Sequence, residues 1–281
     1  MFKSKNTNIV QNEPIIRKSK SVALFCNARD EENIKEWAAY NLVIGFDIII
    51  IFDHKSKIPI NTLFNSKRIF VIRYNQDGGI KIPLMKKALD ISKKMNIDWM
   101  IYLDCDEFLY LKSYINVKHL LQIYNMADAL SINWLFFGSN FHKETPKNLL
   151  IENYTKSDLI LDKHVKTFIR PYAAKYPRDP HHYKMNSNRL FCLPKKNMQP
   201  NSPFNTINIP YTNVGSYIAH YIFQSEESYK KRKCILPADD SGNFREINID
   251  IHSSHNNFEN TTIKDKYAEQ VKEVIKKISS N

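Results

Sequence analysis

The apolar positions between about residues 21 and 135 alternate between short continuous runs and segments with helical spacing. A short apolar run rich in β-branched residues is typical of a strand that is covered on both faces of a sheet. Such runs predict strands at 22–26, 48–52, 69–74, 99–103 and 129–135. Apolar residues spaced three and four apart predict helices from Asp30 as the cap to Gly45, from Pro83 to about Met95, and over 117–124. This alternation predicts an α/β fold with a mostly parallel sheet flanked by helices.

After about residue 136 the alternation weakens. Two further strands are expected at 164–170 and 217–221, a long loop at 194–213, and a short helix that opens at Ser225. Residues 235–260 again have the composition of a loop, and Thr261 or Thr262 is expected to cap a final amphipathic helix. We therefore divide the chain into a polar basic tail at 1–20, one domain at 21–260 and a C-terminal helix at 261–281.

Composition and charge exclude several classes of protein. The 281 residues are 25% charged and 43% hydrophobic, which is ordinary for a globular domain, and the net charge of +12 favours an anionic partner. With only six glycines the chain contains neither a G-x-G-x-x-G motif nor a Walker loop, and its four cysteines form no C-x-x-C pair. Residues 1–20 have no apolar core of a signal peptide, and the longest apolar stretch, 42–52, contains Asp47 and is too short to span a bilayer. We expect a cytoplasmic protein.

The candidate chemistry is concentrated in Asp104-Cys105-Asp106, directly after the predicted strand 99–103. In an open α/β sheet, ligands bind beyond the carboxyl ends of the strands. Two carboxylates this close repel each other unless a cation lies between them, and hard oxygen ligands suit Mg²⁺ or Mn²⁺. An Asp-x-Asp pair also arises by chance, so its meaning depends on the segments around it.

Those segments, taken in order, resemble a GT-A-fold glycosyltransferase of family 92 and the related family-2-like transferases. The resemblance covers about 21–235. It is carried by Glu36-Trp37 with Gly45-Phe46-Asp47, Asp104-Cys105-Asp106-Glu107-Phe108, Trp134 with Phe137-Gly138-Ser139, His164-Val165-Lys166 with Arg170-Pro171, His181-His182-Tyr183, and His220-Tyr221 with Ser225 and Lys230-Lys231.

The resemblance implies a metal-dependent transferase that moves a sugar from a nucleotide-diphosphate donor to a hydroxyl of a glycan, protein or lipid. We expect a UDP-sugar as the donor, a nucleotide-sugar half at 21–135 and an acceptor half at 136–260. The ion, Mn²⁺ or Mg²⁺, would be held by Asp104, Asp106 and His220. The expected donor-binding residues are Asp30, Asp53, Asp104, Lys166, Arg170 and Lys231.

Direct displacement at the anomeric carbon inverts the configuration and needs a carboxylate that accepts the proton of the acceptor hydroxyl. The stretch 238–243 carries the adjacent acids Asp239 and Asp240 and a glycine that permits movement, so these are the expected catalytic residues. Glu226, Glu227 and Asp162 are the reserve candidates.

Three other interpretations remain open. A haloacid-dehalogenase-like phosphatase also places Asp-x-Asp after a strand, but it would have a hydroxyl or β-branched residue where Phe108 stands. A nucleic-acid-binding protein would cluster its charge with stacking aromatics, whereas these lysines spread along the outer faces of helices, so we expect no nucleic-acid partner. A degenerate transferase fold that only binds ligand is the third. The basic outer face of the C-terminal helix permits peripheral contact with an anionic membrane, but we favour packing of its apolar stripe on the domain.

Overall fold

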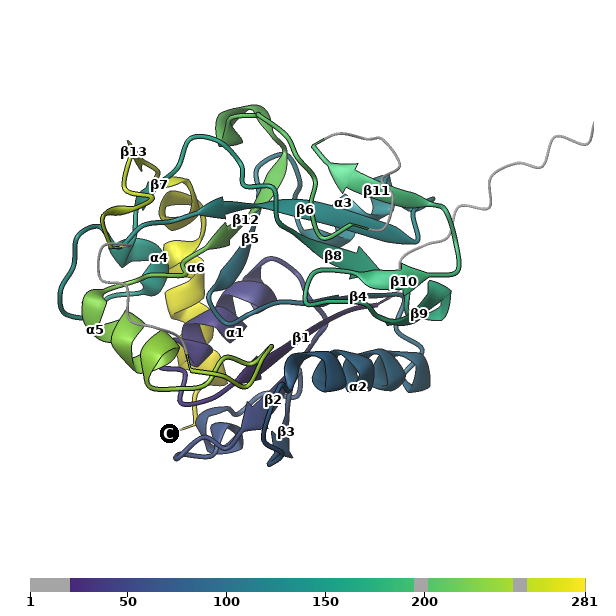
Figure 1. Ribbon diagram of the computed structural model, residues 1–281, viewed down its shortest axis with the longest axis horizontal. Coiled ribbons are helices and arrows are strands. Elements are labelled where there is room, and N and C mark those ends of the chain that lie inside the picture. The colour runs from purple at the N-terminus through teal and green to yellow at the C-terminus, as the bar shows by residue number, and fades with distance from the viewer. Residues whose placement is uncertain (1–20, 195–201, 245–251, 281) are drawn as a thin grey trace, which may run out of the picture.

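The computed structural model describes residues 21–194, 202–244 and 252–280, which form a layered α/β fold (Figure 1). Its centre is a nine-stranded, mostly parallel sheet of the Rossmann-like kind. In order across the sheet the strands are β3 (Ile69–Tyr74), β2 (Ile48–His54), β1 (Val22–Ala28), β4 (Trp99–Tyr102), β8 (Val165–Ile169), β6 (Ala129–Phe136), β12 (Ser216–His220) and β5 (Glu107–Leu111), and β11 (Leu190–Leu193) pairs with β6. The sequence prediction of the fold class is confirmed.

Parallel pairing aligns the carboxyl ends of the first strands. β1 lies between β2 and β4, so that Ala28 pairs with Asp53 and Phe25 pairs with Tyr102. β8 runs antiparallel to both β4 and β6, and β12 is parallel to β6 but antiparallel to β5. The chain therefore leaves β1 and β4 at the same edge of the sheet, where the Asp104–Asp106 segment lies.

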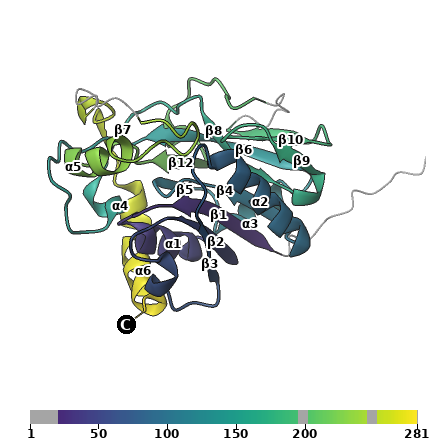
Figure 2. The same cartoon turned by 60° about the horizontal axis from the view of Figure 1, so that its bottom comes forward.

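Both faces of the sheet are covered, which explains why the strands are apolar without alternation. One hydrophobic cluster contains Leu24 and Cys26 and lies under α1 (Ile34–Val43), α3 (Val117–Ile123) and α6 (Thr262–Ile278). The other contains Ala23 and Phe25 and lies under α2 (Lys81–Lys94). Figure 2 shows α2 and the α1–α6 pair on opposite sides of the strands.

The C-terminal helix packs on the domain through its apolar stripe. Ile263, Tyr267 and Val271 are buried, and the rings of Tyr40 in α1 and Tyr267 meet edge to face with centroids 5.1 Å apart. The favoured prediction for this helix is thus confirmed. No helix among the described residues has the length and apolar character needed to cross a membrane.

The second half of the chain adds short elements around the sheet. They are α4 (Leu150–Asn153), β7 (Lys156–Ser157), β9 (Ala174–Pro177), β10 (Tyr183–Met185), α5 (Glu226–Tyr229), which continues as a π-helical segment (Lys230–Cys234), β13 (Phe258–Glu259) and 3₁₀ segments at Ile60–Leu63, Pro171–Ala173 and Tyr211–Asn213. The Ser225 hydroxyl accepts from the Ser228 amide, as expected for the cap of α5.

Some local predictions were wrong. Asp30 does not cap α1, because the helix begins at Ile34 and the Asp30 carboxylate instead accepts from the Lys57 amide at 2.7 Å. No strand was predicted after the acidic block, yet Glu107–Leu111 forms β5 and pairs with β12. The predicted tail at 1–20, and parts of the predicted loops at 195–201 and 245–251, lie outside the described residues.

Candidate functional site

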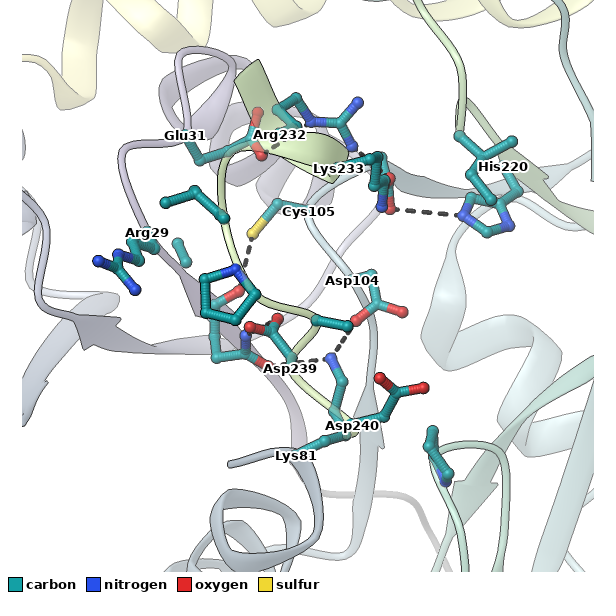
Figure 3. Close-up of a pocket in the computed structure, with 18 of the residues that line it drawn as sticks. Arg29, Glu31, Lys81, Asp104, Cys105, His220, Arg232, Lys233, Asp239 and Asp240 are labelled. Carbon is teal, nitrogen blue, oxygen red and sulfur yellow. Dashed lines mark hydrogen bonds and ion pairs between the residues drawn. The ribbon is translucent and has the colours of Figure 1, made fainter. Parts of the chain in front are cut away.

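A cleft of about 270 Å³ lies at the carboxyl edge of β1 and β4 (Figure 3). Its walls carry Asp104 and Asp106 from the β4–β5 turn and five cationic side chains. These cations are Arg29, Lys81, Lys166, Arg232 and Lys233. Acids and bases from widely separated parts of the chain therefore converge on one cavity.

Asp104 is held by two lysines that belong to rigid elements. Lys81, the first residue of α2, pairs with Oδ1, and Nζ of Lys166 in β8 lies 3.0 Å from Oδ2. Both lysine side chains are almost fully buried. Burial alone would raise the pKa of Asp104, but the charges of Lys166 and Lys81 hold it well below its usual range. Asp104 is therefore an ionised carboxylate whose two oxygens are both paired.

Glu107 contacts both Asp104 and Lys166. Its Oε2 accepts from the Asp104 amide at 2.9 Å and lies 3.5 Å from Lys166 Nζ. Burial raises the pKa of Glu107 to about 8, although the positive charge of Lys166 opposes the shift. Glu107 thus fixes the turn that presents both aspartates.

Asp106 is paired on the other side of the cleft. Its Oδ2 accepts from Arg232 and, at 3.2 Å, from Lys233 Nζ, and its Oδ1 lies 3.6 Å from His220 Nε2. Burial would raise the pKa of Asp106, but Lys233, Arg232 and His220 hold it well below its usual range. Burial lowers the pKa of His220, although Asp106 opposes that shift. Figure 3 shows Arg232, Lys233 and His220 on one side of Asp104, with Lys81 and Asp239 on the other.

The fit of these side chains to a divalent ion depends on which of their oxygen and nitrogen atoms lack a partner. Within the described ranges, no group of three His, Cys, Asp or Glu side chains is already gathered as a metal site. Asp106 Oδ1 is nevertheless buried without a hydrogen-bond partner and lies beside His220 Nε2. Mg²⁺ is commonly held by one or two carboxylates together with substrate phosphates. Asp106 and His220 fit such a site, whereas both oxygens of Asp104 are occupied by lysines.

The expected catalytic loop lies at the rim of this cleft. Asp239 and Asp240 both line it; Asp239 Oδ2 accepts from Asn27 at 2.5 Å, and the Lys81 amide donates to the Asp239 carbonyl at 2.9 Å. A Cβ on Gly79 would lie 2.5 Å from the Asp240 carbonyl oxygen, so the close approach of the two backbones requires glycine there. The loop is therefore seated on the turn before α2.

A second pocket, of about 610 Å³, adjoins the cleft and shares Arg29, Glu31, Arg232 and Leu236 with it. Its walls include exposed Asp30 and the apolar side chains of Ile58, Ile60, Leu63 and Ile235. Lys231 also lines this pocket, where its Nζ lies 2.9 Å from Glu227. Two predicted donor-binding residues thus belong to the second pocket.

The structure does not bring Asp53 and Arg170 to either cavity. The Asp53 carboxylate is buried and accepts from the amides of Ser56 and Ile60 and from Arg73, so it organises the turn after β2. Arg170 donates to the carbonyls of Ala127 and Asn125, and its guanidinium lies 4.4 Å from the centroid of the Trp99 ring. These contacts are at the amino end of β4, away from Asp104.

The reserve acids also lie outside the cleft. Asp162 Oδ1 contacts His164 at 2.6 Å, and Glu227 pairs with Lys231. Glu226 lies 4.0 Å from Lys230 and is likewise absent from the cleft wall.

The contributors to the cleft that were missed in the sequence include Asn27, Lys81, Arg232 and Lys233. Lys81 is in the first turn of α2, where a cation opposes the helix dipole, but the sequence prediction began this helix at Pro83 and so gave no sign of it. Arg232 and Lys233 carried no signal either, since a basic run at the end of a helix is ordinary.

No protein-family model and no curated protein matches the sequence. Among solved structures, a UDP-glucose pyrophosphorylase complexed with UDP-glucose is 10% identical, with a TM-score of 0.31, and the match covers 90% of this chain and 87% of that one. A cytidylyltransferase from Leptospira borgpetersenii is 13% identical, with a TM-score of 0.27 over 56% of this chain and 62% of that one. Likenesses this distant say nothing about the activity of this chain.

Proposed function

We propose that the protein is a glycosyltransferase that uses a nucleotide-diphosphate sugar, with a UDP-sugar as the expected donor. The observation that carries the proposal is the pair of ionised aspartates after β4, which shares a cleft with five cationic side chains, next to a larger pocket. The resemblance of the sequence to GT-A enzymes of family 92 supports the same assignment.

The departing diphosphate needs positive charge nearby, because negative charge develops on it as the bond between the anomeric carbon and the diphosphate oxygen breaks. Lys81 and Lys166 are fixed by α2 and β8, and Arg232 and Lys233 come from the segment after α5. The adjoining pocket would take the nucleoside, with the Asp30 carboxylate available to a ribose hydroxyl. The two cavities meet at Arg29 and Arg232, where the phosphates would join the nucleoside.

Asp106 and His220 would hold the divalent ion, and Asp104 would keep the two lysines in place. When bound, the ion would supply Lewis-acid neutralisation of the diphosphate. Asp239 or Asp240 would accept the proton of the acceptor hydroxyl as its oxygen attacks the anomeric carbon. The acceptor would enter beside Trp134 and His181, which line the same cleft.

The proposal is tested with a panel of nucleotide sugars and Mn²⁺, scored for slow donor hydrolysis, because this assay needs no acceptor. We expect turnover of one donor, and loss of metal-dependent UDP binding in calorimetry for Asp106→Asn. His220→Ala should be milder, because water can replace one ligand. Asp90→Asn, at an exposed position of α2, is the matched control.

Equal turnover after exhaustive chelation would contradict the proposed metal dependence. Absence of metal-dependent binding of both UDP and GDP would contradict the proposed donor class.

A further inference from the structure

We propose that Arg232 and Lys233 act as exchangeable counter-ions: they leave Asp106 for the donor diphosphate, and this frees Asp106 to ligate the metal. Nucleotide and metal would then bind as a coupled pair. The inference rests on the proposed function and adds a positioning role for these two residues.

The first support is that the two cations use a carboxylate that the metal also needs. Oδ2 of Asp106 accepts from both Arg232 and Lys233, whereas Oδ1 is buried without a partner beside His220. Two positive charges at hydrogen-bond distance from a carboxylate repel a divalent ion that approaches the same group. The ion pairs therefore compete with metal binding.

The second support is the difference between the two pairs of cations. Lys81 and Lys166 have side chains that are 5% and 1% exposed and extend from a helix and a central strand. Arg232 and Lys233 are 14% and 19% exposed and lie on a π-helical segment at the cleft wall. π-Helical turns occur frequently at functional sites. The cations on Asp106 are thus more accessible to a ligand than those on Asp104.

The third support is unused hydrogen-bonding capacity on Arg232. Its Nη1 is buried without a partner, while Nη2 pairs with Asp106 and Nε lies 3.5 Å from Glu31. A guanidinium suits phosphate because its donors form a planar fork. Arg232 also lines both cavities, so a diphosphate that bridges them would pass this side chain.

Linkage makes the inference measurable. If the cations oppose the metal but assist the diphosphate, removal of one of them must move the two affinities in opposite directions. Coupling between sites is commonly 5- to 150-fold. For Lys233→Gln we expect Mn²⁺ alone to bind about fivefold more tightly, and UDP without metal to bind about fivefold more weakly. The affinity gain for UDP on adding Mn²⁺ should also change from its wild-type value.

The experiment is calorimetry on the full chain with Mn²⁺ alone, UDP alone and both together. Lys233→Gln is the main variant, because Arg232 also contacts Glu31 and its loss could disturb the fold. Lys230→Gln is the matched control, since Lys230 lies on the same segment, is exposed and does not line the cleft. Thermal unfolding checks that both variants are folded.

Opposite shifts in Lys233→Gln, with unchanged values in Lys230→Gln, would support the exchange. Shifts of the same sign, or none, in a protein that binds UDP would overturn it and leave the proposed function standing. Wild-type protein that binds neither UDP nor GDP, with or without Mn²⁺, would overturn both.

Discussion

Glu36 places a carboxylate in the interior, where it joins two helices. Its two oxygens accept from the amides of Leu150 at 2.6 Å and Ile151 at 3.0 Å, and these amides begin α4. Burial raises the pKa of Glu36 to about 7, although the two amide hydrogen bonds oppose the shift. The contact between α1 and α4 therefore depends on a group that titrates near neutral pH.

The pKa of Glu36 predicts how stability changes with pH. The folded protein holds the proton up to about pH 7, whereas an unfolded chain releases it near the ordinary value of 4.5. Between these values the folded state binds more protons at Glu36, so the contribution of this group to the free energy of unfolding falls as pH rises, by up to about 1.4 kcal/mol per pH unit. Glu36→Gln removes this contribution, so the free energy of unfolding of the variant relative to wild type should rise from pH 5 through pH 6 to pH 7 in urea unfolding.

Glu107 adds a decline of the same sign that extends to about pH 8, whereas the lowered pKa values of His181 and His220 add a rise below about pH 6.5, so the variant is compared with wild type at each pH. Glu273→Gln, at an exposed position of α6, is the control and should follow the wild-type profile. An unchanged slope in Glu36→Gln would contradict the assigned pKa.

At the residue scale, the sequence located acids at strand ends but not their partners. Asp104, Asp106, His220 and Lys166 do meet in the cleft. Asp53 also ends a strand, yet Arg73 from the neighbouring β3 and two amides already satisfy it. Position along a chain does not reveal which neighbouring strand supplies a counter-ion, so a strand-end acid alone cannot be assigned to a site.

At the scale of elements, α6 shows how an amphipathic helix with a basic outer face is used. The apolar stripe is buried against α1, and two of the outer lysines have partners in the protein. Lys272 Nζ lies 2.6 Å from Glu152 and 3.0 Å from Glu269, and Lys266 donates to the Leu111 carbonyl. The stripe that would enter a membrane is therefore already covered, which favours a structural role.

Ile263→Ala should accordingly lower the free energy of unfolding by about 2 to 5 kcal/mol, because it removes a buried side chain from the α6 contact. Urea denaturation gives this value, and Lys264→Ala at an exposed neighbouring position should change it by less than about 0.5 kcal/mol.

Flotation of the full chain with anionic liposomes tests the membrane alternative. We expect no salt-sensitive binding through this helix. Binding that is lost when Lys264, Lys276 and Lys277 are replaced by Gln would contradict that expectation.

Elements with their own hydrophobic pattern could be predicted, whereas elements defined by a distant partner could not. The strands β1, β2, β4 and β6 are mostly apolar runs that are almost entirely buried, and the outer strand β3 is a mostly apolar run that is partly exposed. β5 begins at acidic Glu107 and is recognisable only through its pairing with β12, more than 100 residues later. The same holds for the two-residue strands β7 and β13, which pair with each other.

For the whole molecule, the cleft depends on contacts between the first and the last third of the described chain. Asn27 and Lys81 both hold Asp239, one through its carboxylate and the other through its carbonyl. A Cβ on Gly242 would lie 2.9 Å from the Gly78 carbonyl carbon, so glycines on both sides allow the backbones to meet. The glycine in 238–243 was expected to permit movement; here it also permits this close contact.

The expected general base lies in this long-range contact, and it provides the last prediction. Asp239 faces Asn27 inside the cleft, and Asp240 is exposed at the rim, where an acceptor hydroxyl would arrive. Loss of a general base commonly costs about a hundredfold or more in rate. Asp239→Asn or Asp240→Asn should therefore lower kcat with a true acceptor by at least about a hundredfold. UDP affinity should be kept, because the amide has the same shape and lies outside the proposed nucleoside pocket, and Asp90→Asn should keep both parameters. Product analysis by NMR should show an inverted anomeric configuration. A retained configuration, or near-normal kcat in both variants, would remove this loop from the chemistry and leave it as a structural cover over Lys81.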